Sequence, residues 1–520
     1  MWAGRHVVLG VSGGIACYKS CFLARRLVES GATVDAVLTQ SAAEFVRPVT
    51  FEGLTGRPVL TSLWDRGGAL AHVRLGRAPD LVIVAPATAN LIARVAQGLA
   101  DDLLTTLLLA RTAPVLLAPA MNDEMYANPL TQRNLAILVD RGFAVVGPDV
   151  GALAEGPSER PGRMSEPETI LAHAARLLRA RGPLAGRRVV VTAGPTRESI
   201  DPVRVVTNRS SGKMGYRVAE AAWERGADVV LISGPVALAP PVGVTVRRVE
   251  TTKDLEDAVR ADLPAADVLV MAAAPADYRP AHPSPSKQPR IDGALAVPME
   301  PTDDILGATE ERRRPGSVIV GFALETGDPL PKARAKLERK HLDLIVVNDA
   351  LEPGAGFEHE TNRVALLDRD GGMRILPLQS KRDVADAILD AVEARLGGGE
   401  ETLPDPADGA GWGRGNPGGT RARSGEACPI EPVRDGCGSD RARGRGRTQM
   451  EERRAAHSRP RARHRAAGAD AAGRRPARRA RIARRHRRAD PHHQLLRALR
   501  APDLRRAGRG KPCSKDGLRG

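Results

Sequence analysis

Short apolar runs alternate with amphipathic helical segments along most of the 520-residue chain, and this alternation constrains the fold more than any other feature. Residues 6–10 (HVVLG) and 81–85 (LVIVA) are typical of buried strands, and residues 16–30 have the spacing of an amphipathic helix. Further strands are predicted at residues 33–39, 115–118 and 144–146. Strands that alternate with helices build a parallel sheet with helices on both faces.

A break at Gly182-Pro183 separates this block from a second block of the same kind. Strands of the second block are predicted at residues 188–192, 228–233, 268–272, 318–322 and 344–347, and a final helix at 384–396. We therefore predict two doubly wound, Rossmann-like α/β domains, each built on a parallel sheet. Their predicted bounds are residues 1–178 and 188–397, with a linker at 179–187 and a tail at 398–520.

The composition changes completely in the tail. Residues 398–520 hold 31 basic and 14 acidic side chains, whereas the remainder of the chain holds 47 and 48. The formal net charge of +16 therefore comes from the tail alone. Arg, Gly, Ala and Pro dominate the tail, and this composition predicts disorder. Two origins stay open: a basic tail that binds nucleic acid without sequence specificity, or an off-frame translation of GC-rich coding sequence, which we favour.

The sequence lacks the signals that mark membrane-spanning, secreted and disulfide-stabilised proteins. No apolar run reaches the ~20 residues of a membrane helix. The first residues lack the apolar stretch and cleavage site of a secretory signal. The five cysteines are too few and too scattered for a disulfide framework. We therefore expect a cytoplasmic protein without a membrane partner.

Small and hydroxyl-bearing residues mark the carboxyl ends of four predicted strands in the first block. They are Gly10, Ser12, Gly13 and Gly14, then Thr39 and Ser41, then Ala87, Thr88 and Ala89, and finally Met121 and Asn122. Ligands of open α/β sheets bind at this edge, and backbone N–H groups at a helix start favour anions. Together the four strand ends predict a site for a phosphate-bearing cofactor. His72 lies in a predicted loop before the third of them, where structural and catalytic roles both stay open.

These residues resemble a known family. The runs Gly-Val-Ser-Gly-Gly-Ile-Ala at 10–16, Ala-Pro-Ala-Thr-Ala-Asn at 85–90 and Pro-Ala-Met-Asn at 119–122 are similar to motifs of the flavin-dependent cysteine decarboxylases. The resemblance implies that the four strand ends hold FMN, that His72 is the essential histidine, and that Asn122 binds the substrate carboxylate. The family usually carries a cysteine that helps to protonate the product, and this chain has Glu155 in its place. Glu155 is therefore a candidate acid.

Polar motifs also occur in the second block. Asp201–Arg204 and Thr207–Gly215 bring hydroxyls, amides and glycines to the start of a predicted helix, which suits either a phosphate or a capped polar loop. The run Ala272–Arg279 follows a predicted strand. Lys336 and Lys340 lie four residues apart on one face of a predicted helix. A triphosphate-binding pair and a solvated helix face both stay open for these lysines.

This set resembles the phosphopantothenate–cysteine ligases over about residues 186–396, and a decarboxylase block followed by a ligase block is the bifunctional bacterial arrangement. The resemblance implies CTP and Mg²⁺, with Arg204 and Asn208 handling an acyl-cytidylate intermediate. Lys287 begins a Lys-Gln-Pro-Arg stretch where the family has Lys-Ile-Lys-Lys/Arg, and it would supply positive charge. The implied nucleotide site comprises Ala274, Asp277, Lys287, Asp304, Ile305, Phe322, Lys336 and Lys340, with Asp277 as the metal ligand.

The leading hypothesis is therefore a bifunctional enzyme of coenzyme A biosynthesis. It would use CTP to join cysteine to 4′-phosphopantothenate, and then decarboxylate phosphopantothenoylcysteine to 4′-phosphopantetheine. Glu155 motivates an alternative, in which a working ligase is fused to a flavin-binding scaffold that no longer decarboxylates. The resemblance further implies a homo-oligomer, with trimers formed through the decarboxylase and dimers through the ligase.

Overall fold

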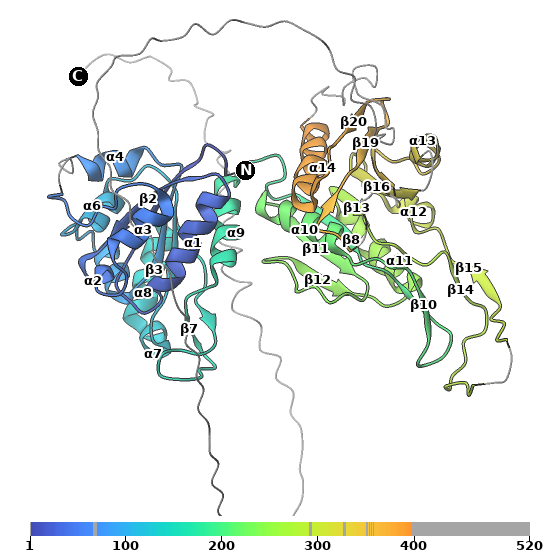
Figure 1. Ribbon diagram of the computed structural model, residues 1–520, viewed down its shortest axis with the longest axis horizontal. Coiled ribbons are helices and arrows are strands. Elements are labelled where there is room, and N and C mark those ends of the chain that lie inside the picture. The colour runs from blue at the N-terminus through green and yellow to red at the C-terminus, as the bar shows by residue number, and fades with distance from the viewer. Residues whose placement is uncertain are drawn as a thin grey trace, which may run out of the picture. The chain divides into compact units, whose positions relative to one another are not determined.

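The computed structural model describes residues 2–65, 70–290, 294–325, 329–349 and 358–397, and the single residues 352, 354 and 356. Two α/β modules make up this part of the chain (Figure 1). The predicted tail at 398–520 lies outside the described residues, so both hypotheses about its origin stay predictions.

The first module is built on a five-stranded parallel sheet with the strand order β2-β1-β3-β4-β5. The strands are β1 (His6–Val11), β2 (Thr33–Leu38), β3 (Leu81–Ala87), β4 (Val115–Pro119) and β5 (Phe143–Val145). All five were predicted, and their ends differ from the prediction by at most two residues. The strand order reverses between β1 and β3, which creates the crevice where sheets of this kind bind ligands.

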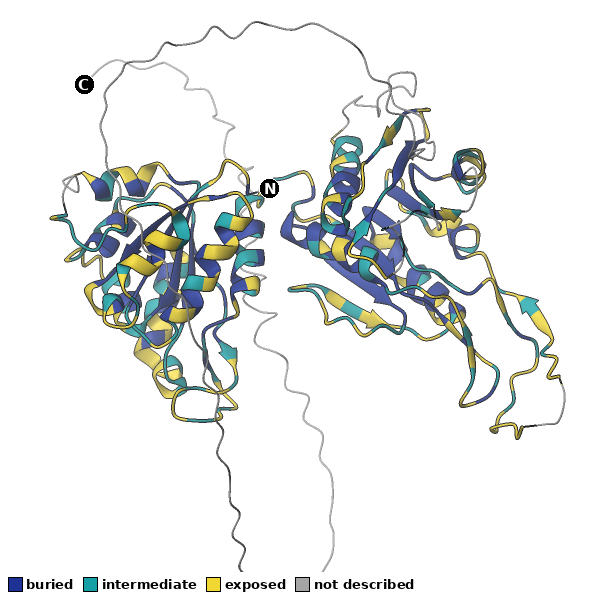
Figure 2. Cartoon of the chain, viewed as in Figure 1, coloured by how far each residue is buried: buried dark blue, intermediate teal, exposed yellow. Residues whose placement is uncertain are grey.

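Helices cover both faces of this sheet, as predicted (Figure 2). One core cluster joins the sheet to α1 (Cys17–Glu29), α3 (Pro48–Thr55) and α9 (Pro167–Leu178). The opposite cluster joins it to α4 (Ala71–Arg77), α5 (Ala89–Ala96), α6 (Leu103–Leu109) and α8 (Pro129–Asp140). The remaining elements are short: α2 (Gln40–Ala43), α7 (Asp123–Ala127), β6 (Asp149–Val150) and β7 (Pro161–Arg163).

An eight-stranded sheet forms the second module, in the order β12-β11-β8-β13-β16-β17-β19-β20. Its strands are β8 (Arg188–Ala193), β11 (Asp228–Ser233), β12 (Thr245–Arg248), β13 (Val268–Met271), β16 (Val318–Glu325), β17 (Leu344–Asp349), β19 (Ala365–Asp368) and β20 (Met373–Ile375). The first six are parallel, which confirms the predicted parallel sheet. β19 pairs antiparallel with β17, and β20 pairs antiparallel with β19; neither of these two strands was predicted. The order reverses between β8 and β13.

The helices of the second module pack on both faces of its sheet. One core cluster includes α10 (Lys213–Glu224) and α14 (Lys381–Leu396), and the other includes α11 (Thr252–Asp262), α12 (Ile305–Ala308) and α13 (Pro329–Arg339). Three two-stranded ribbons complete the module: β9 (Arg197–Ser199) with β10 (Val205–Thr207), β14 (Tyr278–Pro280) with β15 (Met299–Pro301), and β18 (Thr361–Asn362) with β21 (Gln379–Ser380). Among the described residues, no helix combines the length and apolar character needed to cross a membrane.

Candidate active sites

The carboxyl ends of β2, β1, β3 and β4 meet at one edge of the first sheet, because these strands are parallel neighbours. At the switch point between β1 and β3, the hydroxyl of buried Ser12 donates to the carbonyl oxygen of Pro86 at 2.7 Å. The same hydroxyl accepts from the backbone N–H of Thr88 at 3.0 Å and lies 3.2 Å from the Thr88 hydroxyl. The turns after β1 and β3 are therefore held together.

The turns after β1 and β2 are in equally close contact. A Cβ atom added to Gly13 would lie 2.5 Å from Cβ of Ser41 and 2.7 Å from the Ser41 carbonyl carbon, so only glycine fits there. The hydroxyl of Thr39 accepts from the backbone N–H of Ala42 and caps α2, at a distance of 3.2 Å. The first site thus gathers hydroxyl groups and helix starts around glycine backbone, a set that suits a phosphate group.

Other predicted cofactor residues lie in the same turns or beside them. Ala87 ends β3, Thr88 caps α5, and Ala89 is the first residue of that helix. Gly14 is partly buried, and a Cβ there would lie 3.6 Å from Cγ2 of Thr88. Gly10 lies inside β1, where a Cβ would be 2.5 Å from Cδ1 of Leu104, so core packing alone accounts for this glycine.

His72 lies in α4, which corrects the prediction that it lies in a loop. Its Nδ1 atom is buried and has no hydrogen-bond partner in the part of the chain that the structure describes. Buried polar atoms are almost always paired, since an unpaired one costs the free energy of lost hydration. The unpaired nitrogen is therefore consistent with a group that contacts a ligand.

Asn122 and Glu155 are brought together by the structure, although 33 residues separate them. The amide nitrogen of Asn122 donates to Oε1 of Glu155 at 3.2 Å, while its carbonyl oxygen caps α7 by accepting from the backbone N–H of Glu124 at 2.9 Å. Glu155 is exposed, in a tight turn where Leu153 and Gly156 exchange backbone hydrogen bonds. Met121, next to Asn122, donates its backbone N–H to the carbonyl oxygen of Gly162 at 3.0 Å.

The two described cysteines do not offer a substitute acid. Burial raises the pKa of the Cys17 thiol, which donates to the carbonyl oxygen of Ser12 at 3.2 Å. Burial also raises the pKa of the Cys21 thiol, and the neighbouring Cys17 adds to this effect. Buried thiols with raised pKa values are poorly reactive, so both serve packing, as predicted.

In the second module, the turns after β8 and β13 meet at the switch point of the sheet. The backbone N–H of Ala274 donates to the carbonyl oxygen of Gly194 at 2.9 Å. The amide nitrogen of Asn208 donates to the carbonyl oxygens of Ala274 and Pro275, at 3.3 and 2.9 Å. Two predicted ligase residues, Asn208 and Ala274, therefore lie in contact.

Four further predicted nucleotide residues form pairs near the end of β16. Nζ of Lys336 donates to the carbonyl oxygen of Phe322 at 2.8 Å. Burial, together with the charge of Lys340, lowers the pKa of Lys336. Lys340 forms a 2.7 Å ion pair with Asp304, the residue before α12 and Ile305. Burial acts to raise the pKa of Asp304, but the Lys340 interactions outweigh it and leave that pKa below its usual range.

The remaining predicted ligase residues lie beside the ribbons: Arg204 directly before β10, Asp277 directly before β14, and Lys287 between β14 and β15. Arg204 forms a 2.5 Å ion pair with Asp201 and also donates to the carbonyl oxygen of Gln288 at 2.8 Å. Lys287 and Asp277 are exposed. Among the described residues, no group of three or more His, Cys, Asp or Glu side chains could hold a metal ion. Asp201 was not predicted as a site residue, although it begins the polar motif at 201–204 and its pairing with Pro202 is typical of a turn.

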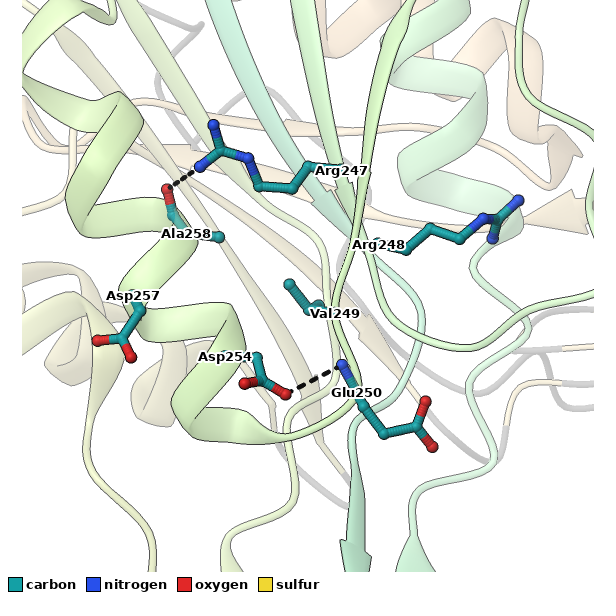
Figure 3. A pocket seen from close by; sticks show the side chains of 7 residues that line it. All are labelled: Arg247, Arg248, Val249, Glu250, Asp254, Asp257 and Ala258. Carbon is teal, nitrogen blue, oxygen red and sulfur yellow. Dashed lines mark hydrogen bonds between the residues drawn. The ribbon is translucent and has the colours of Figure 1, made fainter. Parts of the chain in front are cut away.

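A hollow of about 670 Å³ lies between β12 and α11 (Figure 3). It is lined by Arg247, Arg248, Val249, Glu250, Asp254, Asp257 and Ala258. The backbone N–H of Glu250 donates to Asp254 across one end of it, at 3.3 Å. None of the predicted site residues lines this hollow, so it is separate from both candidate sites.

Comparison with known proteins covers both modules. Residues 1–179 match the family described as "Flavoprotein", and residues 184–396 match "DNA/pantothenate metabolism flavoprotein C-terminal domain". The coenzyme A biosynthesis bifunctional protein CoaBC of Vibrio cholerae is 45% identical over 398 residues, 76% of this chain and 99% of that protein. The CoaBC proteins of Bacillus subtilis (45% identity, 76% and 98% coverage) and Mycobacterium tuberculosis (47%, 76% and 97%) are similarly related. The chain belongs to this family of coenzyme A biosynthesis bifunctional proteins.

Membership of the coenzyme A biosynthesis bifunctional family confirms the leading hypothesis. The chain is a bifunctional enzyme of coenzyme A biosynthesis, in which a flavoprotein decarboxylase and a ligase are joined. The alternative of a flavin scaffold without decarboxylase activity is not favoured by these matches. The domain bounds and the roles assigned to individual residues stay predictions.

Proposed function

We propose that this enzyme uses CTP to ligate cysteine to 4′-phosphopantothenate and uses FMN to decarboxylate the product to 4′-phosphopantetheine. The observation that carries the proposal is the position of the predicted residues in both modules. Polar groups gather at the switch point of each sheet, the place where doubly wound sheets bind phosphate-bearing ligands.

In the ligase step, the phosphopantothenate carboxylate attacks the α-phosphorus of CTP and displaces pyrophosphate. The cysteine amine then attacks the acyl carbon of the acyl-cytidylate and displaces CMP. Asn208 anchors the turn after β13 through its amide nitrogen, which leaves its carbonyl oxygen to accept from the cysteine amine. Lys336 and Lys340 offset the charge of the triphosphate. Asp277 would hold Mg²⁺, which would offset the charge of the triphosphate, since Mg²⁺ commonly uses one or two carboxylates plus substrate phosphates.

The residues of the first site fit FMN. The glycine turn at Gly13 presses against Ser41, and hydroxyls of Thr39 and Thr88 lie at helix starts where a phosphate is favoured. When bound, FMN would supply a two-electron acceptor and donor, which would give the decarboxylation the electron sink that the substrate lacks. The chain itself binds and orients the substrate, with Asn122 holding the carboxylate and His72 placing its buried nitrogen on the ligand.

Glu155 supplies the proton that the enethiolate needs after CO₂ has left. The carboxyl group is within hydrogen-bonding distance of Asn122, the residue that would hold the substrate carboxylate, and this supports a position near the reacting carbon. A carboxylic acid in this position would act as a general acid, a role that typically contributes 10²–10⁴-fold in rate. Substrate binding at Asn122 displaces Glu155 from its present contact and frees it for this transfer.

The Glu155→Gln variant tests this role. We expect formation of 4′-phosphopantetheine to slow by about 10²-fold, because the amide cannot donate a proton in the same way. Release of CO₂ from phosphopantothenoylcysteine should continue, since it precedes protonation. The matched control is Glu159→Gln, which alters a nearby exposed carboxylate. Equal rates of product formation in the Glu155→Gln variant and the unaltered enzyme would exclude Glu155 as the acid.

The proposed function as a whole is tested by a product assay. The purified full chain is incubated with 4′-phosphopantothenate, cysteine, CTP and Mg²⁺, and products are identified by mass. Appearance of 4′-phosphopantetheine is the expected result. Arrest at phosphopantothenoylcysteine would contradict the decarboxylase half, and absence of that compound would contradict the ligase half.

We further propose a homo-oligomer, with trimers formed through the decarboxylase and dimers through the ligase. The molar mass of the full chain in solution, measured by light scattering, tests this proposal.

A further inference from the structure

The carboxylate of Asp201 is buried in the second module and accepts hydrogen bonds from two separate chain segments. Its side chain is 0% exposed. Oδ1 accepts from the backbone N–H groups of Val203 and Arg204, both at 2.8 Å. Oδ2 accepts from Nε and Nη2 of Arg204 at 2.8 and 2.5 Å, and from the backbone N–H of Gln288 at 3.3 Å. The Arg204 guanidinium holds the pKa of Asp201 well below its usual range, so the carboxylate stays charged.

The second of these segments, residues 284–288, is called here the strap. The strap is tied to the turn at 200–204 by three hydrogen bonds. The backbone N–H of Ser284 donates to the carbonyl oxygen of Ile200 at 2.8 Å. At its other end, Gln288 donates to Asp201 and accepts from Nη2 of Arg204 at 2.8 Å. Both backbone groups of Gln288 are therefore held by one ion pair.

Lys287 lies in the strap directly before Gln288, so the ion pair fixes the backbone beside a cation assigned to the ligase. Arg204, the other assigned cation of this region, uses Nε and Nη2 for Asp201 and the strap. Its Nη1 atom forms no hydrogen bond within the described residues, which leaves it for a ligand. Two of the three substrates of the proposed ligase, 4′-phosphopantothenate and CTP, carry phosphate, and cations bind phosphate best when their geometry is preorganised.

We propose that Asp201 is a positioning residue of the ligase, which fixes Arg204 and the strap against each other so that Arg204 and Lys287 are presented to phosphate-bearing substrates as one unit. Asp201 acts through these two cations and does not itself contact substrate. The inference rests on the proposed ligase function. In this proposal Asp201 orders the strap, which lies more than 80 residues away in the sequence.

The Asp201→Asn variant of the full chain tests the proposal. The amide has the same size, but its nitrogen cannot accept from Arg204 and Gln288, so the ion pair is lost and the strap is held less firmly. We expect ligase kcat/KM for 4′-phosphopantothenate to fall by about tenfold or more, mainly through KM. Decarboxylation of added phosphopantothenoylcysteine should not change. We also expect faster tryptic cleavage of the Lys287–Gln288 bond, followed by mass spectrometry, because proteolysis follows local opening.

The matched control is Asp257→Asn, which alters an exposed carboxylate on α11 and should change neither measurement. If Asp201→Asn does not fold, Arg204→Gln replaces it in the cleavage measurement, since it also removes the donor to Gln288. Cleavage at Lys287 and ligase KM both within twofold of the unaltered enzyme would overturn the proposal. If the unaltered enzyme forms no phosphopantothenoylcysteine, the proposed function fails instead, and the cleavage measurement still decides the role of Asp201.

Discussion

The pKa of a buried charged residue depends on its burial and on the charges around it, and Lys381 is an example in this enzyme. Lys381, the first residue of α14, is 3% exposed, and its Nζ donates to the carbonyl oxygen of Gly356 at 2.8 Å. Burial, reinforced by nearby Lys213 and only partly opposed by Glu360, lowers the pKa of Lys381 to about 8. A positive charge at a helix N-terminus is disfavoured as well.

This shift has a predictable effect on stability. The folded pKa lies below the unfolded value of about 10.4, so between these values the unfolded chain binds more protons and stability rises with pH. Below about pH 8 the penalty of the buried charge is fully present. Relative to Lys381→Met, the unaltered protein should therefore gain about 2 kcal/mol in free energy of unfolding from pH 7.5 to 10, measured by urea unfolding. A stability difference between the two proteins that does not change with pH would contradict this prediction. Lys253→Met, at an exposed lysine, is the control.

At the scale of elements, the first site depends on how closely neighbouring turns approach. Gly13→Ala would place a methyl group 2.5 Å from Cβ of Ser41, against the backbone of the turn after β2. We expect this variant to lose bound flavin, seen as loss of visible absorbance, and to lose about 1–3 kcal/mol of stability through overpacking. Gly53→Ala is the matched control, because no atom lies within 4 Å of the added Cβ. Retention of flavin by Gly13→Ala would show that the turns can separate without affecting the site.

Elements with buried apolar runs could be predicted from the sequence, and elements without them could not. The central strands of both sheets carry Val, Leu and Ile on both faces, which makes them evident. β12 is largely exposed and reads TVRR, so it lacks this pattern. β19 and β20 form a short antiparallel hairpin, and the Asp370-Gly371 pair between them is a hairpin signal that the sequence analysis missed. α4 was taken as a loop because it has seven residues, two of them arginines.

The candidate sites could likewise be predicted from the sequence only in part. The strand-end residues could be predicted because the topology of a parallel sheet brings them to one edge. The contacts of Asn122 with Glu155, and of Asp201 with Gln288, join loops whose paths depend on tertiary packing. All four residues lie in motifs that the sequence analysis identified, but only the structure shows which of them touch.

For the whole molecule, the chemistry assigned here lies within residues 1–397, which carry nearly balanced charge, whereas residues 398–520 carry the entire positive excess. The Vibrio cholerae relative is matched over 99% of its length by 76% of this chain. We therefore expect a chain ending at Gly397 to retain both activities within about twofold in the coupled product assay. A twofold change corresponds to less than ~0.5 kcal/mol of activation free energy.

Nucleic-acid binding tests the tether hypothesis for the tail, because absence of binding by the full chain would exclude it. If the tail is a functional tether, the full chain should bind duplex DNA at low salt and lose that binding steeply as salt rises, because counterion release scales with the phosphates neutralised. The shortened chain should not bind under either condition, since its net charge is close to zero. A loss of ligase or decarboxylase activity on shortening, with substrates and protein concentration held fixed, would show instead that residues beyond 397 contribute to the sites themselves.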